Sequence, residues 1–206
     1  MTPAERPVGM TVEMVRAILG LDGALKTETR RPVKPLPART TTLHEVDQFG
    51  CAVFTDGTII RSPLGVVGDL VYVRERARVE GVSKRFGRLM LTYEADDHMG
   101  TVPWPDRIKR PKLGNCLANG VYKEGARLWL RINSVDVERL RDISGMAAMR
   151  EGFGQPCDVD YLEIPRGLFR ETWDSIYGKR PGLLFGDNPW VWVYRFSLVS
   201  TTGRPK

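Results

Sequence analysis

The segment Leu25–Arg31 places one lysine amine, two threonine hydroxyls and two arginine guanidinium groups within seven residues. An amine beside a hydroxyl can serve as a base–nucleophile pair, and neighbouring arginines can hold an anion or a carbonyl oxygen. If the segment is extended, Lys26 and Glu28 share one face of the strand and Thr29 lies on the other. A tight turn would instead bring Lys26 and Thr29 together. The alternative without chemistry is a solvated basic turn.

A short helix directly before this segment can hold it in place. Thr11 is a candidate N-cap, because its hydroxyl can accept a hydrogen bond from an early helical N–H group. Apolar side chains follow at helical spacing, at Val12, Met14, Val15, Ile18 and Leu19. Gly20 and Gly23 then end the helix, so a rigid element leads into Lys26.

The rest of the chain predicts several strands and two more short helices. Strands are expected as a hairpin at 51–60 around Asp56-Gly57, after the turn Gly68-Asp69, at 88–94 and at 127–137. One helix is expected from the N-cap Ser144 to Met149, ended by Gly152. Another begins with Pro165 at its first position and buries Leu168, Phe169, Trp173 and Ile176. Strands outnumber helices and no βαβ rhythm repeats, which favours a small α+β barrel.

The last predicted strand has the clearest pattern. Large apolar side chains recur at every second position, at Trp190, Trp192, Tyr194, Phe196 and Leu198. Such a row can stack nucleic-acid bases or fill a core. Val191 and Val193 make the opposite face apolar as well, which favours the core.

Length and composition indicate one ordinary globular domain. The chain has 206 residues, of which 42% are hydrophobic and 27% are charged. We expect a flexible tail at 1–9, one domain at 10–200 with a long insertion at about 76–126, and a second tail at 201–206. The chain shows no membrane-spanning run and no apolar signal segment at its start, so a cytoplasmic location is expected.

Cysteine and histidine usage shows no metal signature. The cysteines Cys51, Cys116 and Cys157 are far apart, and the two histidines are His44 and His98. We therefore expect reduced thiols, no metal site and no cofactor.

The charge balance points to an anionic partner. The formal net charge is +6, and basic residues gather in two clusters, one of Lys84, Arg85 and Arg88 and one of Arg107, Lys109, Arg110 and Lys112. Either cluster can neutralise phosphates, as in RNA binding, or form solvated loop surface.

Several ordered motifs resemble the ASCH family (activating-signal-cointegrator homology), a branch of the PUA-like β-barrels, and in particular its phage and prophage members. The stretch MVRAILGLDGALKTETRRPVKP resembles the opening helix and the G-x-K-T-x-T-R-R signature of the family. GDLVYVRE, RINSVDVERLRDISGMAAMREGF and FRETWDSIYG followed by NPWVWVYRFSLV resemble later landmarks. The resemblance implies an α+β, PUA-like small β-barrel with flanking short helices and a long insertion.

The resemblance also implies an activity. Related single-domain members are metal-independent amidohydrolases that remove the acyl group from N4-acetylcytidine, with a Lys, a Thr three residues later and a distant Glu as the catalytic set. These positions carry over to Lys26, Thr29 and Glu151. The same resemblance gives as substrate-binding candidates Arg30, Arg31, Arg74, Glu75 and Arg127, although Arg74 and Glu75 are also suited to a structural pair. The partner it implies is a small nucleoside substrate.

This sequence departs from the family pattern at two places. The glycine that normally precedes the catalytic Lys is displaced, which leaves Gly23-Ala24-Leu25. The Met-Pro-Arg-Trp-Ala-Ser-Arg stretch of phage members is replaced by Val121–Arg127, which keeps only the final arginine. The rim of the ligand pocket is therefore specific to this chain.

In the mechanism that these residues suggest, Thr29 attacks the acyl carbonyl and Lys26 takes its proton. A neutral lysine is required, so the pKa of Lys26 must fall through burial and through its arginine neighbours. Glu151 orients the amine or a water molecule. Direct attack by Lys26 and activation of water by Lys26 stay open as variants.

Two other functions compete with hydrolysis. One is a non-catalytic RNA-binding module that reads a modified base, which the basic clusters favour. The other is a ribonuclease, which would need a general base that neither histidine supplies at a matching landmark. The sequence does not give the oligomeric state.

Overall fold

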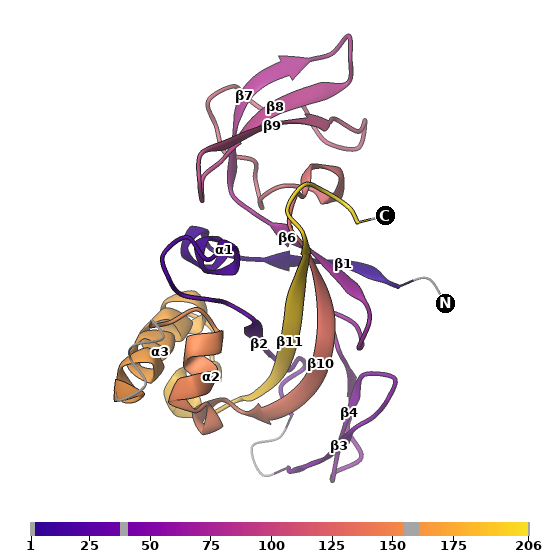
Figure 1. Ribbon diagram of the computed structural model, residues 1–206. Helices are drawn as coiled ribbons and strands as arrows, with labels where there is room; N and C mark the ends of the chain where they lie inside the picture. The colour runs from indigo at the N-terminus through magenta and orange to yellow at the C-terminus, as the bar shows by residue number, and fades with distance from the viewer. Residues whose placement is uncertain (1–2, 38–40, 155–160, 206) are drawn as a thin grey trace. The chain divides into compact units, whose positions relative to one another are not determined.

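In the computed structural model, the described residues are 3–37, 41–154 and 161–205 (Figure 1). They form two compact units. The first unit comprises Met1–Arg16, Leu70–Arg131 and Leu198–Lys206, and the second comprises Ala17–Asp69 and Ile132–Ser197. No helix within the described ranges is long and apolar enough to cross a membrane.

The first unit is built on strands. Strand β1 (Glu5–Gly9) pairs in parallel with β6 (Leu70–Arg74), and β6 pairs antiparallel with the first residues of β10 (Trp129–Arg139). A separate antiparallel sheet has the order β7 (Ala77–Ser83), β8 (Arg88–Tyr93) and β9 (His98–Pro103). A short 3₁₀ helix, η1, follows at Lys123–Gly125.

Helix α1 (Val12–Leu19) links the units along the chain. The Thr11 hydroxyl accepts a hydrogen bond from Met14 N at 3.3 Å, as the N-cap prediction requires. Gly20 and Gly23 have φ angles of +68° and +77°, a conformation that favours glycine and ends the helix.

The second unit pairs β2 (Glu28–Pro32) antiparallel with β11 (Trp190–Ser200). Its other sheet has the order β3 (Leu43–Val46), β4 (Cys51–Phe54) and β5 (Ile59–Arg61). The helices are α2 (Gly145–Arg150) and α3 (Glu163–Tyr177), with 3₁₀ turns η2 (Leu140–Asp142) and η4 (Phe185–Asp187). Helices α2 and α3 pack side by side (Figure 1).

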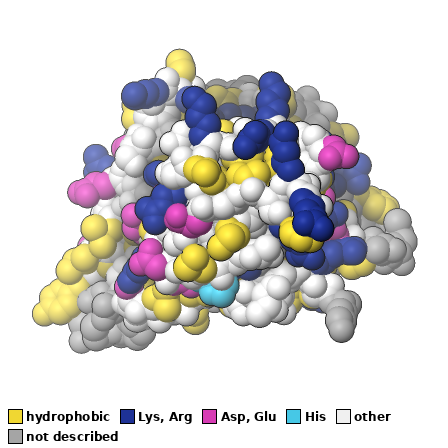
Figure 2. Space-filling model, turned by 90° about the horizontal axis from the view of Figure 1, so that it is seen from above, with side chains coloured by type: hydrophobic (Ala, Val, Ile, Leu, Met, Phe, Trp, Pro, Cys, Tyr) yellow, Lys and Arg dark blue, Asp and Glu magenta, His cyan; other side chains and the backbone are white. Residues whose placement is uncertain are grey.

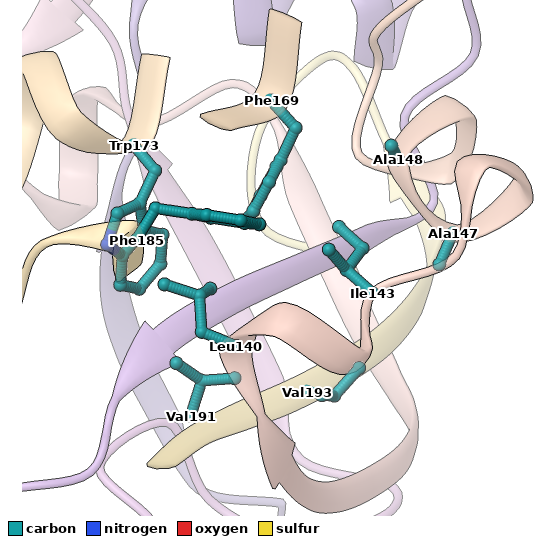
Figure 3. Packing of buried hydrophobic residues seen from close by; sticks show 9 residues of the cluster. All are labelled: Leu140, Ile143, Ala147, Ala148, Phe169, Trp173, Phe185, Val191 and Val193. Carbon is teal, nitrogen blue, oxygen red and sulfur yellow. The ribbon is translucent and has the colours of Figure 1, made fainter. Parts of the chain in front are cut away.

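The core of the second unit lies between its helices and β11. Phe169 and Trp173 of α3, Ala147 and Ala148 of α2, and Val191 and Val193 of β11 are buried together (Figure 3). On the other face of β11, Trp192, Tyr194 and Phe196 are also buried. The prediction that the aromatic row of this strand belongs to a core is therefore confirmed, apart from the exposed Leu198.

The α+β class is confirmed by these elements. The five-stranded sheet has the order β1-β6-β10-β11-β2, and no closed barrel forms among the described strands. The hairpin at 51–60, the strands at 70–74, 88–93 and 129–139, and the N-cap Ser144, which accepts from Ala147 N at 3.1 Å, are as expected.

Several expectations were wrong. The described part of the supposed tail at 1–9 contains β1, and at the other end Gly203 N donates to Arg127 O at 3.0 Å. The segment 76–126 contains the three-stranded sheet β7–β9, of which the sequence predicts only the strand at 88–94. Helix α3 begins two residues before Pro165, and its Leu168 and Ile176 are exposed.

Candidate active site

Lys26 lies in the short link between α1 and β2. Its backbone N donates to Ala17 O at 3.1 Å, and the next residue, Thr27, donates to Arg150 O at 2.8 Å. From Glu28 the chain is a strand, with Thr29 opposite Tyr194 of β11. The exposed fractions of Lys26, Glu28, Thr29 and Arg30 are 2%, 0%, 1% and 3%. The segment is therefore extended and buried, and the solvated basic turn is wrong.

The Lys26 amine is held at three points. Its Nζ atom donates to Glu28 O at 2.9 Å, to Glu151 O at 2.7 Å and to Glu151 Oε2 at 2.6 Å. An ammonium group has three N–H donors, so these contacts use all of them. The structure thus brings together two of the three residues that the ASCH resemblance names as catalytic.

Glu151 is placed by the end of helix α2. It is the C-cap residue, and its backbone N donates to Ala147 O at 3.0 Å. Gly152 follows with φ of +96°, and a Cβ atom there would lie 2.9 Å from Ala17 Cβ and 3.3 Å from Lys26 Cβ. Only a glycine therefore lets the end of α2 lie this close to Lys26.

Arg30 joins Glu151 to two further carboxylates. Its Nη1 atom lies 3.2 Å from Glu151 Oε1 and 2.7 Å from Glu28 Oε1. Its Nη2 atom lies 2.8 Å from Glu138 Oε1. The guanidinium group is thus engaged by two buried carboxylates, of Glu28 and Glu151, and by the partly buried Glu138.

Glu28 of β2 is a second buried carboxylate beside Arg30. Its Oε2 atom accepts from Arg150 Nε at 3.1 Å and from Arg195 Nε at 3.0 Å. Neither arginine, nor Glu138, was among the residues selected from sequence. A signal was available for Arg195, which is the one charged residue of β11 and follows Val191 and Val193 on the same face.

The charges of this cluster shift its proton affinities. Burial lowers the pKa of Lys26; Glu151 acts against this, and Arg31 and Arg30 add to it. Burial alone would raise the pKa of Glu28, but Arg30, Arg195 and Arg150 outweigh it and hold that pKa below its ordinary value. Burial raises the pKa of Glu138 although Arg30 opposes the shift.

Thr29 belongs to a different pair. Its hydroxyl accepts a hydrogen bond from Arg31 Nη1 at 2.9 Å, and Arg31 also donates to Arg30 O at 2.8 Å. Side chains alternate along β2, so Thr29 and Arg31 lie on the face opposite Glu28 and Arg30. The contacts of the described residues include no hydrogen bond between Thr29 and Lys26.

The remaining predicted site residues lie in the first unit. Glu75 is buried and pairs with Arg127, whose Nη2 atom lies 2.8 Å from Glu75 Oε2 and 2.8 Å from Asp96 Oδ1. Arg74 donates to Asn119 O. The structural partner of Glu75 is therefore Arg127, and the expected pair of Arg74 with Glu75 is wrong.

No group of three or more His, Cys, Asp or Glu side chains suited to a metal ion occurs within the described ranges. Cys51 and Cys116 are free thiols, whereas Cys157 lies outside the described residues.

Comparisons with solved structures give distant similarities. No family model and no curated protein matches the chain. Protein EF3133 from Enterococcus faecalis V583, of the family model DUF984, is 12% identical with a TM-score of 0.39, covering 97% of this chain and 78% of that chain. An ASCH domain from Lactobacillus crispatus JV V101 is 14% identical with a TM-score of 0.36, covering 96% and 80%. At these TM-scores neither similarity assigns the chain to a family, and its function rests on its own residues.

Proposed function

We propose that the protein is a metal-independent amide hydrolase that removes the acyl group from N4-acetylcytidine or a related N4-acylated cytosine nucleoside. The observation that carries the proposal is the contact of 2.6 Å between Lys26 Nζ and Glu151 Oε2. The ASCH resemblance pairs these two residues as catalytic, although they are 125 residues apart in the sequence. Their contact therefore supports Lys26 and Glu151 as the catalytic pair.

Lys26 acts as the base in this proposal. Attack on the acyl carbonyl needs an amine with a free lone pair, and burial lowers the pKa of Lys26 in the required direction. Its proton can pass along the short contact to Glu151 Oε2. The neutral amine then takes a proton from the nucleophile, and the pair returns a proton to the departing cytosine nitrogen.

The geometry favours water as the nucleophile over Thr29. The Thr29 hydroxyl accepts from Arg31 and lies on the other face of β2, whereas a nucleophile has to reach the lone pair of Lys26. Water attack forms the carbon–oxygen bond and breaks the carbon–N4 bond, which yields the carboxylic acid and cytidine. Lys26 and Glu151 are buried, so the acyl group has to displace packed side chains to reach them.

The test is release of cytidine from N4-acetylcytidine by the purified protein, followed by chromatography. We expect Lys26→Ala and Glu151→Gln each to lower kcat/KM by about 10²- to 10⁴-fold, the range of general acid–base catalysis. Matched controls are Lys179→Ala and Glu171→Gln, because both side chains are exposed and belong to the second unit. Near-ultraviolet circular dichroism separates lost catalysis from lost folding.

Thr29→Ala decides between the two nucleophiles. We expect activity within about tenfold of the unmodified protein, because loss of one positioning hydrogen bond costs about 1 kcal/mol. A loss as large as that of Lys26→Ala would assign the attack to Thr29. Absence of cytidine release by the unmodified protein, with the fold intact, would overturn the proposed function.

A further inference from the structure

The first unit contains a cavity of about 540 Å³ between β6 and the segment 107–123. Its volume falls in the range of small-molecule sites, about 300–1,000 Å³. Six cationic residues line it, namely Arg74, Arg107, Lys109, Arg110, Lys112 and Lys123. No Asp or Glu occurs among the described residues that line it.

Four of these six cations have no acidic partner among the described residues, and one of the four, Arg74, donates to Asn119 O. Arg107 pairs with Glu124 and Lys123 pairs with Glu5, so two of the charges are balanced within the protein. For Lys109, Arg110 and Lys112, the contacts of the described residues include no ion pair. Figure 2 shows Lys and Arg side chains gathered next to hydrophobic ones on the face it presents. Like charges that line one cavity repel, and a bound anion relieves the repulsion.

The cavity also has aromatic lining. Tyr72 and Tyr122 belong to it, and both are half-buried. The Tyr72 ring lies 5.6 Å from the Trp129 ring, and the Tyr122 hydroxyl donates to Pro103 O at 2.5 Å. Rings fixed in this way can stack against a planar ligand such as a nucleic-acid base.

The segment that closes the cavity is anchored to β6 and β7. Val121 N donates to Glu75 O at 2.9 Å, and Leu117 N donates to Ala77 O at 2.9 Å. Gly120 has φ of +75°, and a Cβ atom there would lie 2.8 Å from both Arg74 O and Glu75 O. The backbone thus fits against β6 only with glycine at this position, and the lining is part of the folded unit.

We propose that this cavity binds the phosphate groups of a nucleotide, with a tyrosine ring against the base. The density of cations supplies the phosphate contacts, and Tyr72 or Tyr122 supplies the stacking face. A free nucleoside triphosphate and a strand of RNA share this chemistry. The site uses neither Lys26 nor Glu151, so nucleotide binding can be tested independently of the proposed hydrolysis.

The test compares binding of ATP, inorganic triphosphate and oligoadenylate to the full chain by titration calorimetry. Adenine nucleotides carry no N4-acyl group, so this binding is separate from turnover of N4-acetylcytidine. The diagnostic variant replaces Lys109, Arg110 and Lys112 with alanine. The matched control replaces Lys84, Arg85 and Arg88, which are exposed, carry the same charge and do not line the cavity.

We expect the diagnostic variant to weaken ATP binding by about tenfold or more, since a charge-assisted hydrogen bond contributes about 1.5–3 kcal/mol. The control should stay within about twofold, the residual effect of screened distant charge. Tighter binding of ATP than of oligoadenylate identifies a free nucleotide as the ligand, and the reverse order identifies RNA. Equal losses in both variants, or no binding of any probe, would overturn the proposal.

Discussion

The buried amine of Lys26 is held by backbone oxygens as well as by a side chain. Two of its three acceptors are carbonyl oxygens, of Glu28 and of Glu151, and the third is a carboxylate oxygen. Because desolvation opposes the charged amine while Glu151 favours it, a single side chain sets the balance between the two protonation states. Removing the charge of Glu151 should therefore lower the pKa of Lys26 further.

The pH dependence of the proposed hydrolysis follows from this balance. We expect kcat/KM to rise with pH as Lys26 loses its proton, with a midpoint below 10.5, the ordinary pKa of lysine. Glu151→Gln removes the charge that raises this pKa, so the midpoint measured on the residual activity should move to lower pH. A midpoint that stays in place or moves upward would contradict the assignment of Lys26 as the base.

The residues themselves reveal only part of the site. The reactive side chains of Leu25–Arg31 and the alternation of a strand can be deduced from the sequence. The contact between Lys26 and Glu151 spans 125 residues, and no local pattern specifies such a pairing, so it came from the family resemblance. The role of Glu28 was missed because its partner arginines lie on α2 and β11 and meet it only in the folded chain.

The end of helix α2 controls how Glu151 meets Lys26. Gly152→Ala places a Cβ atom 2.9 Å from Ala17 Cβ in a backbone conformation that favours glycine, and we expect a loss of about 1–3 kcal/mol in unfolding free energy. It should also lower kcat, because the added atom displaces Lys26. Gly186→Ala is the control, since nothing lies within 4 Å of its Cβ position. Equal effects of both substitutions in urea unfolding and in turnover would contradict this role of Gly152.

Strand β2 contributes stability through its buried carboxylate. Glu28→Gln leaves Arg30, Arg150 and Arg195 without their shared anion, and we expect a loss of about 3 kcal/mol at pH 7. The folded pKa of Glu28 lies below 4.5, so the contribution of its charge is present above 4.5 and is lost as the pH falls through the folded pKa. The difference between the two proteins in urea unfolding should therefore shrink in acid. A difference that grows in acid would show that the charge of Glu28 does not stabilise the fold.

Elements that short-range interactions define could be predicted from the sequence, whereas strands that depend on pairing with distant segments could not. Thr11 and Ser144 mark helix starts because capping is a short-range interaction. Strand β1 lies in the expected tail and contains Pro7, but β1 is the edge strand of its sheet, where a missing N–H is tolerated. Strand β7 was missed in a charged segment, although Ala77 and Val79 already alternate with Arg78.

At the scale of the whole molecule, the two units have separate cores. Leu89 and Leu91 belong to the core of the β7–β9 sheet, whereas Phe169 and Val193 belong to the core beside β11. Leu89→Ala should cost about 2–5 kcal/mol through loss of contacts and a residual cavity. We expect Leu89→Ala to raise amide hydrogen exchange in β7–β9. Phe169→Ala should instead raise amide hydrogen exchange in α2 and α3. Uniform increases across both units for either substitution would show that the cores unfold as one.

The backbone anchors of Lys26 also limit how the site can diverge. A carbonyl oxygen is present whatever side chain follows it, so replacing Glu28 leaves that acceptor for the amine in place. A substitution at position 28 therefore costs stability through the three arginines that Glu28 pairs with, but it keeps this hydrogen bond of the lysine. Position 151 has no such freedom, because its side chain supplies the only acceptor that can itself carry a proton. As related sequences diverge, an acidic residue at position 151 opposite Lys26 would distinguish proteins that keep this chemistry from proteins that keep only the fold.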